Sequence, residues 1–391
     1  MRASFGALMC VAGLSCLASS ALAQIPGLPP IPSGMPTSIP GIPGLPGVPS
    51  VPGASSKTAK ITSAKNEGDL KLSAGIGVDV GGSLVISMAA IKHPDLPNVP
   101  VNPLLASLSV SASVSGTLAL SCTIGGVSSS SRAPVDLVFV NDTTGSMSGT
   151  VNGISESVKT FAQKIQAGGV DARFSMYTYG DAYATRGSAS KFSVGVGDFD
   201  PPKFDTVPRP YVGLTELAPF EKFLAEMKAS GALGTGGGDA PENTLGALEY
   251  SNSKVAWRQG AAHVFVVIGD NPAHQKAATD KYGPNWSAPN GEDFVSRLNG
   301  TAVAHVVGHD KGAEPLYNLK KLADGTGGNF KELPKDGKVD LTTLGLDSFL
   351  LSGYRGSCTG LASGSLDLVI KATVVGKKIY TGSLAFKVVI S

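Results

Sequence analysis

Two different patterns of apolar residues divide this chain of 391 residues. In residues 134–352, short unbroken apolar runs alternate with stretches in which apolar residues recur at helical spacing. Unbroken apolar strands are typical of parallel sheets that helices cover on both faces. Because strands that alternate with helices build such sheets through right-handed crossovers, we predict a doubly wound, Rossmann-like α/β domain here. We expect strands at residues 137–140, 173–179, 263–268 and 301–307, and helices after residue 150, at 214–229 with Thr215 as a cap, and at 316–323 with a stop at Asp324 and Gly325.

The segments on either side of this region follow a period of two. In residues 57–126 and 353–391, apolar residues alternate with small or polar ones, as in Leu366, Leu368 and Ile370. This alternation predicts antiparallel strands with one face in solvent. The last alternating run ends one residue before the terminus and needs neighbouring strands to pair with. We therefore predict that both flanks form one antiparallel β-sandwich domain in which the α/β domain is inserted.

The first 56 residues show neither pattern. Residues 1–23 have one positive charge, an apolar middle and an Ala-Leu-Ala end, which is the form of a secretory signal peptide. Lipid attachment at Cys16 is an alternative, although the residues before it fit the usual pattern poorly. Residues 24–56 are rich in Pro and Gly, which predicts an extended linker or, alternatively, a Pro-rich ligand. We expect no membrane span and a secreted or extracellular protein, with the periplasm or the cell surface as alternatives.

Oxygen-bearing side chains follow the first apolar run of the α/β region at once. Asp142, Thr144 and Ser146 come between residues 137–140 and the next predicted helix. This position is the carboxyl end of a buried strand, where open α/β sheets place their ligands. One carboxylate and two hydroxyls at alternating positions suit a hard divalent cation, Mg²⁺ or Ca²⁺. An ordinary capped turn between strand and helix is the alternative.

Two later stretches supply further acidic groups for such a site. Asp239 follows the glycines at residues 236–238, where nothing bulky obstructs the approach of the backbone to an ion. Asp270 comes as the apolar run of residues 263–268 ends, so it repeats the position of Asp142. We predict these two aspartates as the ligands of a second and a third loop. His274 is predicted to be a surface-loop histidine or a rim residue that touches a ligand.

With three such loops in this order, residues 134–352 resemble a von Willebrand factor type A domain. The pieces Asp-Thr-Thr-Gly-Ser-Met at residues 142–147 and Gly-Gly-Gly-Asp-Ala-Pro-Glu at residues 236–242 look most like the variety found in hemicentin-like extracellular proteins. In this family the loops form a metal-ion-dependent adhesion site, whose metal keeps one coordination position free for an acidic side chain of a partner protein. The resemblance implies that two hydroxyls bind the ion directly and three carboxylates bind it directly or through water: Thr144, Ser146, Asp142, Asp239 and Asp270.

One residue departs from the adhesion pattern of integrins and collagen receptors. Asp239 stands where those proteins have a threonine. A third carboxylate changes the local charge with a divalent ion from about neutral to about −1, which favours Ca²⁺ and weakens the attraction for an acidic partner. The ion is therefore expected either to bind a partner or to be structural only.

The cysteines suggest how the ends of the inserted region are held together. Two of the four lie in the predicted signal peptide, which leaves Cys122 and Cys358 just before and just after the α/β region. In an exported protein, two cysteines that bracket a domain favour a disulfide. Two separately buried thiols are the alternative.

Composition and motifs exclude several classes of function. A net charge of +2 without a basic run argues against nucleic-acid binding and against a polybasic membrane patch. Nothing resembles a nucleophile elbow, a phosphate loop, a His-Glu-x-x-His motif or a Cys-x-x-Cys motif, so we do not expect an enzyme. The leading expectation is a secreted, metal-dependent module that binds an extracellular protein partner. The alternative is a structural component of a matrix, wall or appendage in which the metal only stabilises the fold.

Overall fold

The computed structural model describes the chain from residue 57 onward, apart from several internal stretches. The described residues are 57–95, 106–114, 118–119, 121–126, 134–180, 211–229, 234, 241–276, 289–313, 315–345 and 354–391. The predicted signal peptide and linker lie outside them. Within these ranges, no helix combines the length and the apolar character that a membrane span requires.

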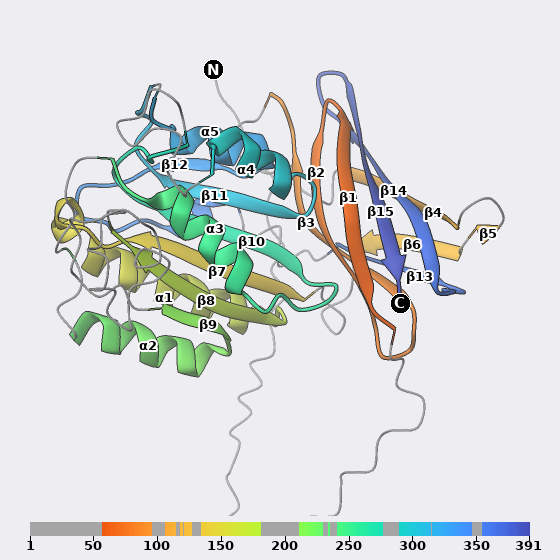
Figure 1. Ribbon diagram of the computed structural model, residues 1–391, viewed down its shortest axis with the longest axis horizontal. Coiled ribbons are helices and arrows are strands. Elements are labelled where there is room, and N and C mark those ends of the chain that lie inside the picture. Colours follow the sequence, from red (N-terminus) through yellow and green to blue (C-terminus); the bar gives the residue numbers. More distant parts are fainter. Residues whose placement is uncertain are drawn as a thin grey trace, which may run out of the picture. The chain divides into compact units, whose positions relative to one another are not determined.

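A six-stranded sheet forms the centre of the α/β region. Its strand order is β12-β11-β10-β7-β8-β9. Neighbouring strands are parallel except for β9, which is antiparallel to β8. The predicted mixed α/β class with a parallel sheet is therefore confirmed (Figure 1). The strands are β7 (Val135–Asp142), β8 (Ala172–Tyr179), β9 (Tyr211–Thr215), β10 (Ala262–Ile268), β11 (Ala302–Gly308) and β12 (Phe330–Glu332).

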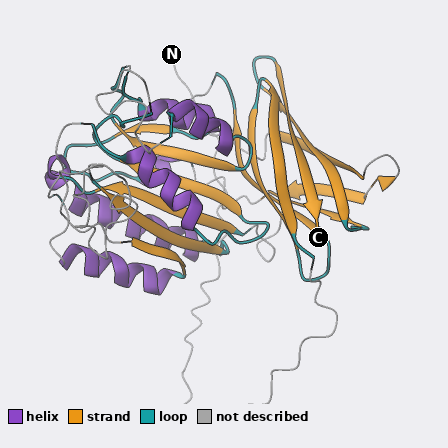
Figure 2. Ribbon diagram, viewed as in Figure 1, coloured by secondary structure: helices purple, strands orange, loops and turns teal. Residues whose placement is uncertain are grey.

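Helices cover both faces of this sheet (Figure 2). One apolar cluster joins one face to α1, α2 and a short 3-10 helix, η4, and a second cluster joins the other face to α3, α4 and α5. Every residue of β7 is buried, which explains its unbroken apolar pattern. The helices are α1 (Val151–Ala167), α2 (Leu217–Ala229), α3 (Thr244–Lys254), α4 (Gly291–Leu298), α5 (Leu319–Thr326) and η4 (Leu341–Leu344), with a further 3-10 turn, η2 (Gly145–Gly149), before α1.

Two predicted helix boundaries are wrong. Leu214 and Thr215 belong to strand β9, so α2 begins later and Thr215 is not its cap. Strand β9 was missed because it is a short edge strand without a fully buried residue. Helix α5 continues through Gly325, which packs so closely against Val295 that a Cβ there would lie 2.4 Å from Val295 Cγ1. The helix ends instead before Gly327, whose φ of 84° is the left-handed conformation of a helix C-cap.

The flanking segments form two antiparallel sheets. The sheet orders are β1-β15-β14-β4-β5 and β2-β3-β13-β6. Their inward side chains make one apolar cluster of their own. The strands are β1 (Ala59–Gly68), β2 (Lys71–Val78), β3 (Leu84–Lys92), β4 (Ala106–Val114), β5 (Leu118–Ala119), β6 (Ser121–Gly126), β13 (Tyr354–Thr359), β14 (Gly364–Val375) and β15 (Ile379–Ile390).

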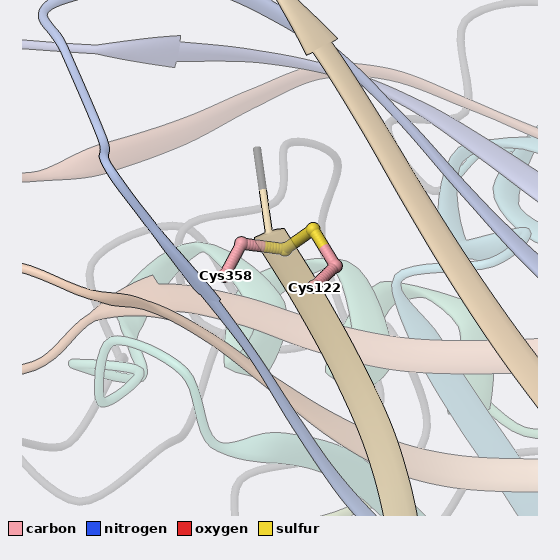
Figure 3. The surroundings of a disulfide bond; sticks show 2 residues. All are labelled: Cys122 and Cys358. Carbon is pink, nitrogen blue, oxygen red and sulfur yellow. A yellow bond between two sulfur atoms is a disulfide. The ribbon is translucent and has the colours of Figure 1, made fainter. Parts of the chain in front are cut away.

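A disulfide links the strand that enters the α/β region to the strand that leaves it. Cys122 of β6 and Cys358 of β13 are directly opposite in the antiparallel register and their sulfur atoms are bonded (Figure 3). The bond closes a loop with a sequence separation of 236 residues. Both connections of the α/β region therefore start from one cross-linked pair of strands.

Candidate metal centre

Strand β7 places the first group of polar side chains at the centre of the sheet edge. It lies between β10 and β8, and its last residue is Asp142. The backbone N–H of Thr143 then donates to Tyr179 O of β8, at 3.0 Å. The 3-10 turn η2 follows and leads directly into α1. The loop after β7 is thus held on one side by β8 and on the other by the start of a long helix.

The oxygens of this loop contact one another. Asp142 Oδ1 accepts hydrogen bonds from Thr144 N at 2.9 Å and from Thr144 Oγ1 at 2.7 Å. Thr144 Oγ1 lies 3.1 Å from Ser146 Oγ. Asp142 and Thr144 are buried, whereas Ser146 is exposed. The cluster therefore runs from a buried carboxylate to a hydroxyl at the surface.

Asp270 joins the same cluster from the neighbouring strand. Residues 267 and 268 of β10 pair with residues 140 and 141 of β7, so the loops after the two strands leave the sheet at the same level. Ser146 Oγ donates to Asp270 Oδ1 at 3.1 Å. The structure thus brings together four of the five predicted ligands. The fifth, Asp239, lies outside the described residues.

Asn271 is a member of the cluster that sequence reasoning missed. Its side-chain amide donates to Asp270 Oδ1 at 2.8 Å and to Ser146 Oγ at 3.4 Å. It therefore connects the loop after β10 to the loop after β7. Its place directly after Asp270, at the same strand end, was the available signal, but an asparagine there is also ordinary turn chemistry.

A buried tyrosine lies behind these carboxylates. Tyr179 Oη accepts a hydrogen bond from Thr244 Oγ1 at 3.0 Å and donates to Ile268 O at 3.4 Å. Burial raises the pKa of Tyr179 well above its ordinary value, and the negative charges of three nearby carboxylates raise it further. The tyrosine is therefore neutral, and its hydroxyl lies close enough to several acidic groups to interact with their charges. These acids are Asp142, Glu242 and Asp270.

Gly269 allows Tyr179 and Asp142 to approach each other. A Cβ at this position would lie 2.5 Å from Tyr179 Oη and 3.4 Å from Asp142 Oδ2. Only a residue without a side chain fits between the hydroxyl and the carboxylate. The glycine before Asp270 is therefore a packing requirement of the site.

Glu242 and His274 are both buried near the second loop. The backbone N–H of Glu242 donates to Pro272 O at 3.1 Å, and His274 N donates to Glu242 O at 3.0 Å. His274 is only 1% exposed, so its interpretation as a surface-loop histidine is wrong. These backbone bonds join the segment after Pro241 to the segment after Asp270.

The donor set fits a hard divalent cation. Asp142, Thr144, Ser146 and Asp270 offer carboxylate and hydroxyl oxygens and no sulfur or imidazole. Acidic side chains alone do not suffice: in the described part of the chain, no group of three or more His, Cys, Asp or Glu side chains is arranged to hold a metal ion. The candidate site therefore combines the carboxylates of Asp142 and Asp270 with the hydroxyls of Thr144 and Ser146.

Comparison with known proteins gives low similarity throughout. No family model and no curated protein matches the chain. Among solved structures, the pilus adhesin SpaC from Lactobacillus rhamnosus GG is 12% identical, with 78% of this chain and 45% of that chain covered and a TM-score of 0.39. Proximal thread matrix protein 1 from the mussel byssus, solved with a zinc-occupied MIDAS motif, is 16% identical, with 61% and 49% covered and a TM-score of 0.35. The chain spans less than half the length of either structure.

Proposed function

We propose that this protein is a secreted binding protein whose α/β region holds a divalent cation at the edge of its sheet and binds an acidic group of an extracellular protein partner there. The observation that carries the proposal is the continuous set of contacts from Asp142 through Thr144 and Ser146 to Asp270. These contacts join the ends of two adjacent parallel strands, and they reach the surface at Ser146.

Each residue has a separate part in the proposed site. Asp142 supplies a buried carboxylate whose orientation is held by Thr144 N. Thr144 and Ser146 supply the hydroxyl oxygens, and Asp270 supplies a second carboxylate. When bound, the cation would offer a positive charge to an acidic side chain of the partner. Asp239 is proposed as a further ligand, and its carboxylate is expected to favour Ca²⁺ over Mg²⁺.

We further infer that residues 134–352 are a von Willebrand factor type A domain of the hemicentin-like variety, inserted in a β-sandwich. The three polar loops, the doubly wound sheet and the separate apolar cluster of the two antiparallel sheets support this inference. The signal-like residues 1–23 and the disulfide support export.

Capture of partners from extracellular material, with and without chelator, tests this function. The wild-type protein is expected to retain a partner in Ca²⁺ or Mg²⁺ and to release it in chelator, whereas Asp142→Ala retains none. Asp310→Ala is the matched control, because Asp310 is an exposed carboxylate after β11 that pairs with Lys320 rather than with the cluster. The proposal would be contradicted if the wild type captured as much partner in chelator as in metal, or if Asp142→Ala captured as much as the wild type.

A second function is favoured by the burial of the site. Asp142 is 0% exposed and Thr144 is 1% exposed, so two of the four described donors are shielded from any partner. A shielded ion would stabilise a structural component of a matrix, wall or appendage without binding a ligand. In that case Ca²⁺ would raise the melting temperature, but assembly and capture would be insensitive to chelator.

A further inference from the structure

A buried lysine joins the two regions of the fold. Lys92 is the last residue of β3, and Asn329 lies between α5 and β12. Lys92 Nζ donates to Asn329 Oδ1 at 2.7 Å and to Gly328 O at 2.5 Å. Lys92 is 7% exposed and Asn329 is 1% exposed. An amine and a carboxamide are thus in contact where little water reaches them.

The distance between the two side chains is short enough for a reaction. Because a carbonyl carbon lies about 1.2 Å from its oxygen, Lys92 Nζ is at most about 3.9 Å from Asn329 Cγ. Reacting atoms in productive complexes are about 3–3.5 Å apart. The amine therefore lies within or just outside the separation from which it attacks the amide carbon.

The amide is held still on its other sides. Asn329 Nδ2 donates to Leu344 O at 2.7 Å, and the backbone N–H of Asn329 donates to His305 Nδ1 at 3.2 Å. Burial lowers the pKa of His305 to about 3, with the positive charge of Lys92 as a smaller cause, so this ring stays neutral and keeps its acceptor. The electrophile is thus fixed while the amine contacts its oxygen.

The surroundings of Lys92 favour the nucleophilic form of its amine. Its pKa is lowered to about 8, chiefly by burial; the charge of Asp324 opposes this shift, and the charge of Lys71 adds to it. About a tenth of the side chain is then neutral at pH 7, which is far more than for an ordinary lysine. Neutral, desolvated lysines are the ones that act as nucleophiles in proteins.

We propose that Lys92 and Asn329 form an intramolecular isopeptide bond. The Nζ–Cγ bond forms and the Cγ–Nδ2 bond breaks. Nδ2 leaves as ammonia with one proton taken from Nζ, so no oxidant or reductant is needed. The product is a secondary amide that ties β3 covalently to the segment between α5 and β12. The disulfide between β6 and β13 lies within one flanking sheet, so this bond would be a side-chain cross-link between that sheet and the α/β region.

Lys71 provides a matched control. It pairs directly with Lys92 across β2 and β3, and its Nζ donates to Asp324 O at 3.0 Å and to Gly325 O at 3.5 Å. Both lysines therefore bind carbonyl oxygens at the end of α5, but the bonds of Lys71 go to backbone carbonyls and only Lys92 is placed against a side-chain amide.

Mass spectrometry of the reduced, denatured chain tests the proposal. The wild-type chain and Lys71→Met are expected to be lighter than their sequences by one ammonia, whereas Lys92→Met and Asn329→Ala have their full mass. Proteolytic digestion of the wild type should yield one branched peptide that contains both residues. A wild-type chain of full mass that gives separate peptides with Lys92 and Asn329 would overturn the proposal. The mass of the wild-type chain decides the proposal without reference to the folding of any variant or to the metal site.

Discussion

At the residue scale, Asp142 shows how burial and chemistry combine in the candidate site. Its carboxylate is fully buried at the end of a strand with eight buried residues, and it accepts two hydrogen bonds from Thr144. The acid at the end of an apolar run is evident in the sequence. The chain of hydrogen bonds that connects it to Asp270 through Thr144 and Ser146 is not evident in the sequence, because it depends on β10 lying next to β7.

Replacing Asp142 should abolish the stabilisation by metal. A cation at a hundredfold excess over its dissociation constant stabilises the folded state by about 2.7 kcal/mol. Asp142→Ala removes the central carboxylate, so its melting temperature should be the same in Ca²⁺, in Mg²⁺ and in chelator. Thermal unfolding followed by circular dichroism measures this, with Asp310→Ala as the control that keeps the response. If the melting temperature of the wild type is the same in Ca²⁺, in Mg²⁺ and in chelator, the protein has no such metal site.

Asn271→Ala should weaken the same site without abolishing it. The amide holds Asp270 Oδ1 and contacts Ser146 Oγ, so its loss leaves the donor oxygens present but less well oriented. Residues that orient metal ligands typically contribute about 10–100-fold to metal affinity. Calcium titration calorimetry should show a loss of this size. An unchanged affinity would show that Asn271 has no part in orienting the site.

His305 should make the protein sensitive to acid. Burial of the ring lowers its pKa from an ordinary 6.5 to about 3 in the folded state. Between these values the unfolded chain binds a proton that the folded chain does not, so stability falls as pH falls from about 6.5 toward 3. At pH 5 this single group costs about 2 kcal/mol relative to pH 7.

The variant His305→Gln isolates this effect, because glutamine keeps an acceptor for Asn329 N. Urea unfolding between pH 7 and pH 5 should show a shallower loss of stability for the variant than for the wild type. A remaining slope is expected from His263, whose pKa burial lowers to about 4. Parallel slopes for the two proteins would show that His305 is protonated in the folded state.

At the element scale, some helices and strands follow from the local sequence pattern, whereas others depend on tertiary packing. The continuous run of β7 and the amphipathic spacing of α1 were predictable, since each reflects the side-chain directions of consecutive residues. Strand β9 was not, because it has only partly buried residues and takes its place by pairing with β8. The end of α5 was misjudged because Gly325 looked like a helix stop, whereas it is a contact point for Val295.

Gly153 in α1 is predicted to tolerate no side chain. Alanine at an exposed helical glycine stabilises by about 1 kcal/mol. Here a Cβ would lie 2.3 Å from Asp336 O and 2.8 Å from Gly337 C, which are backbone atoms. Gly153→Ala should therefore destabilise the protein by about 1–3 kcal/mol, as overpacked sites do.

Chemical denaturation measures this change. Gly213→Ala in β9 is the matched control, because a Cβ there meets nothing within 4 Å, and its effect should stay within about 0.5 kcal/mol. If Gly153→Ala proved more stable than the wild type, the segment at residues 336–337 would not pack on α1.

At the scale of the whole molecule, contacts between residues far apart in the chain join strands and regions. The disulfide connects opposite residues of β6 and β13, and two lysines of the β2–β3 pair contact the end of α5. The bracketing positions of the cysteines were visible in the sequence. The contact between Lys92 and Asn329 was not, because it joins residues whose sequence separation is 237.

Removal of the disulfide should lower the stability of the flanking sheets. The chain-entropy relation gives about 5 kcal/mol for so long a loop, and this is an upper bound because the α/β region already holds the ends of the loop close together. We expect Cys122→Ser/Cys358→Ser to lose about 2–4 kcal/mol in urea unfolding. The shift produced by Ca²⁺ should be retained, since the cluster at Asp142 lies on other strands. A variant as stable as the wild type would show that this bond adds nothing to folding.

The sequence by itself determined the class of each region and the kinds of donor atom at the ends of β7 and β10. Periodicity and turn chemistry are properties of neighbouring residues, so they survive without knowledge of the fold. Only the tertiary structure decided that Asn271 bridges two loops, that Tyr179 lies behind three acids, and that Lys92 reaches Asn329. These contacts depend on which strands are adjacent and how closely the backbones approach, and both are set by packing across hundreds of residues.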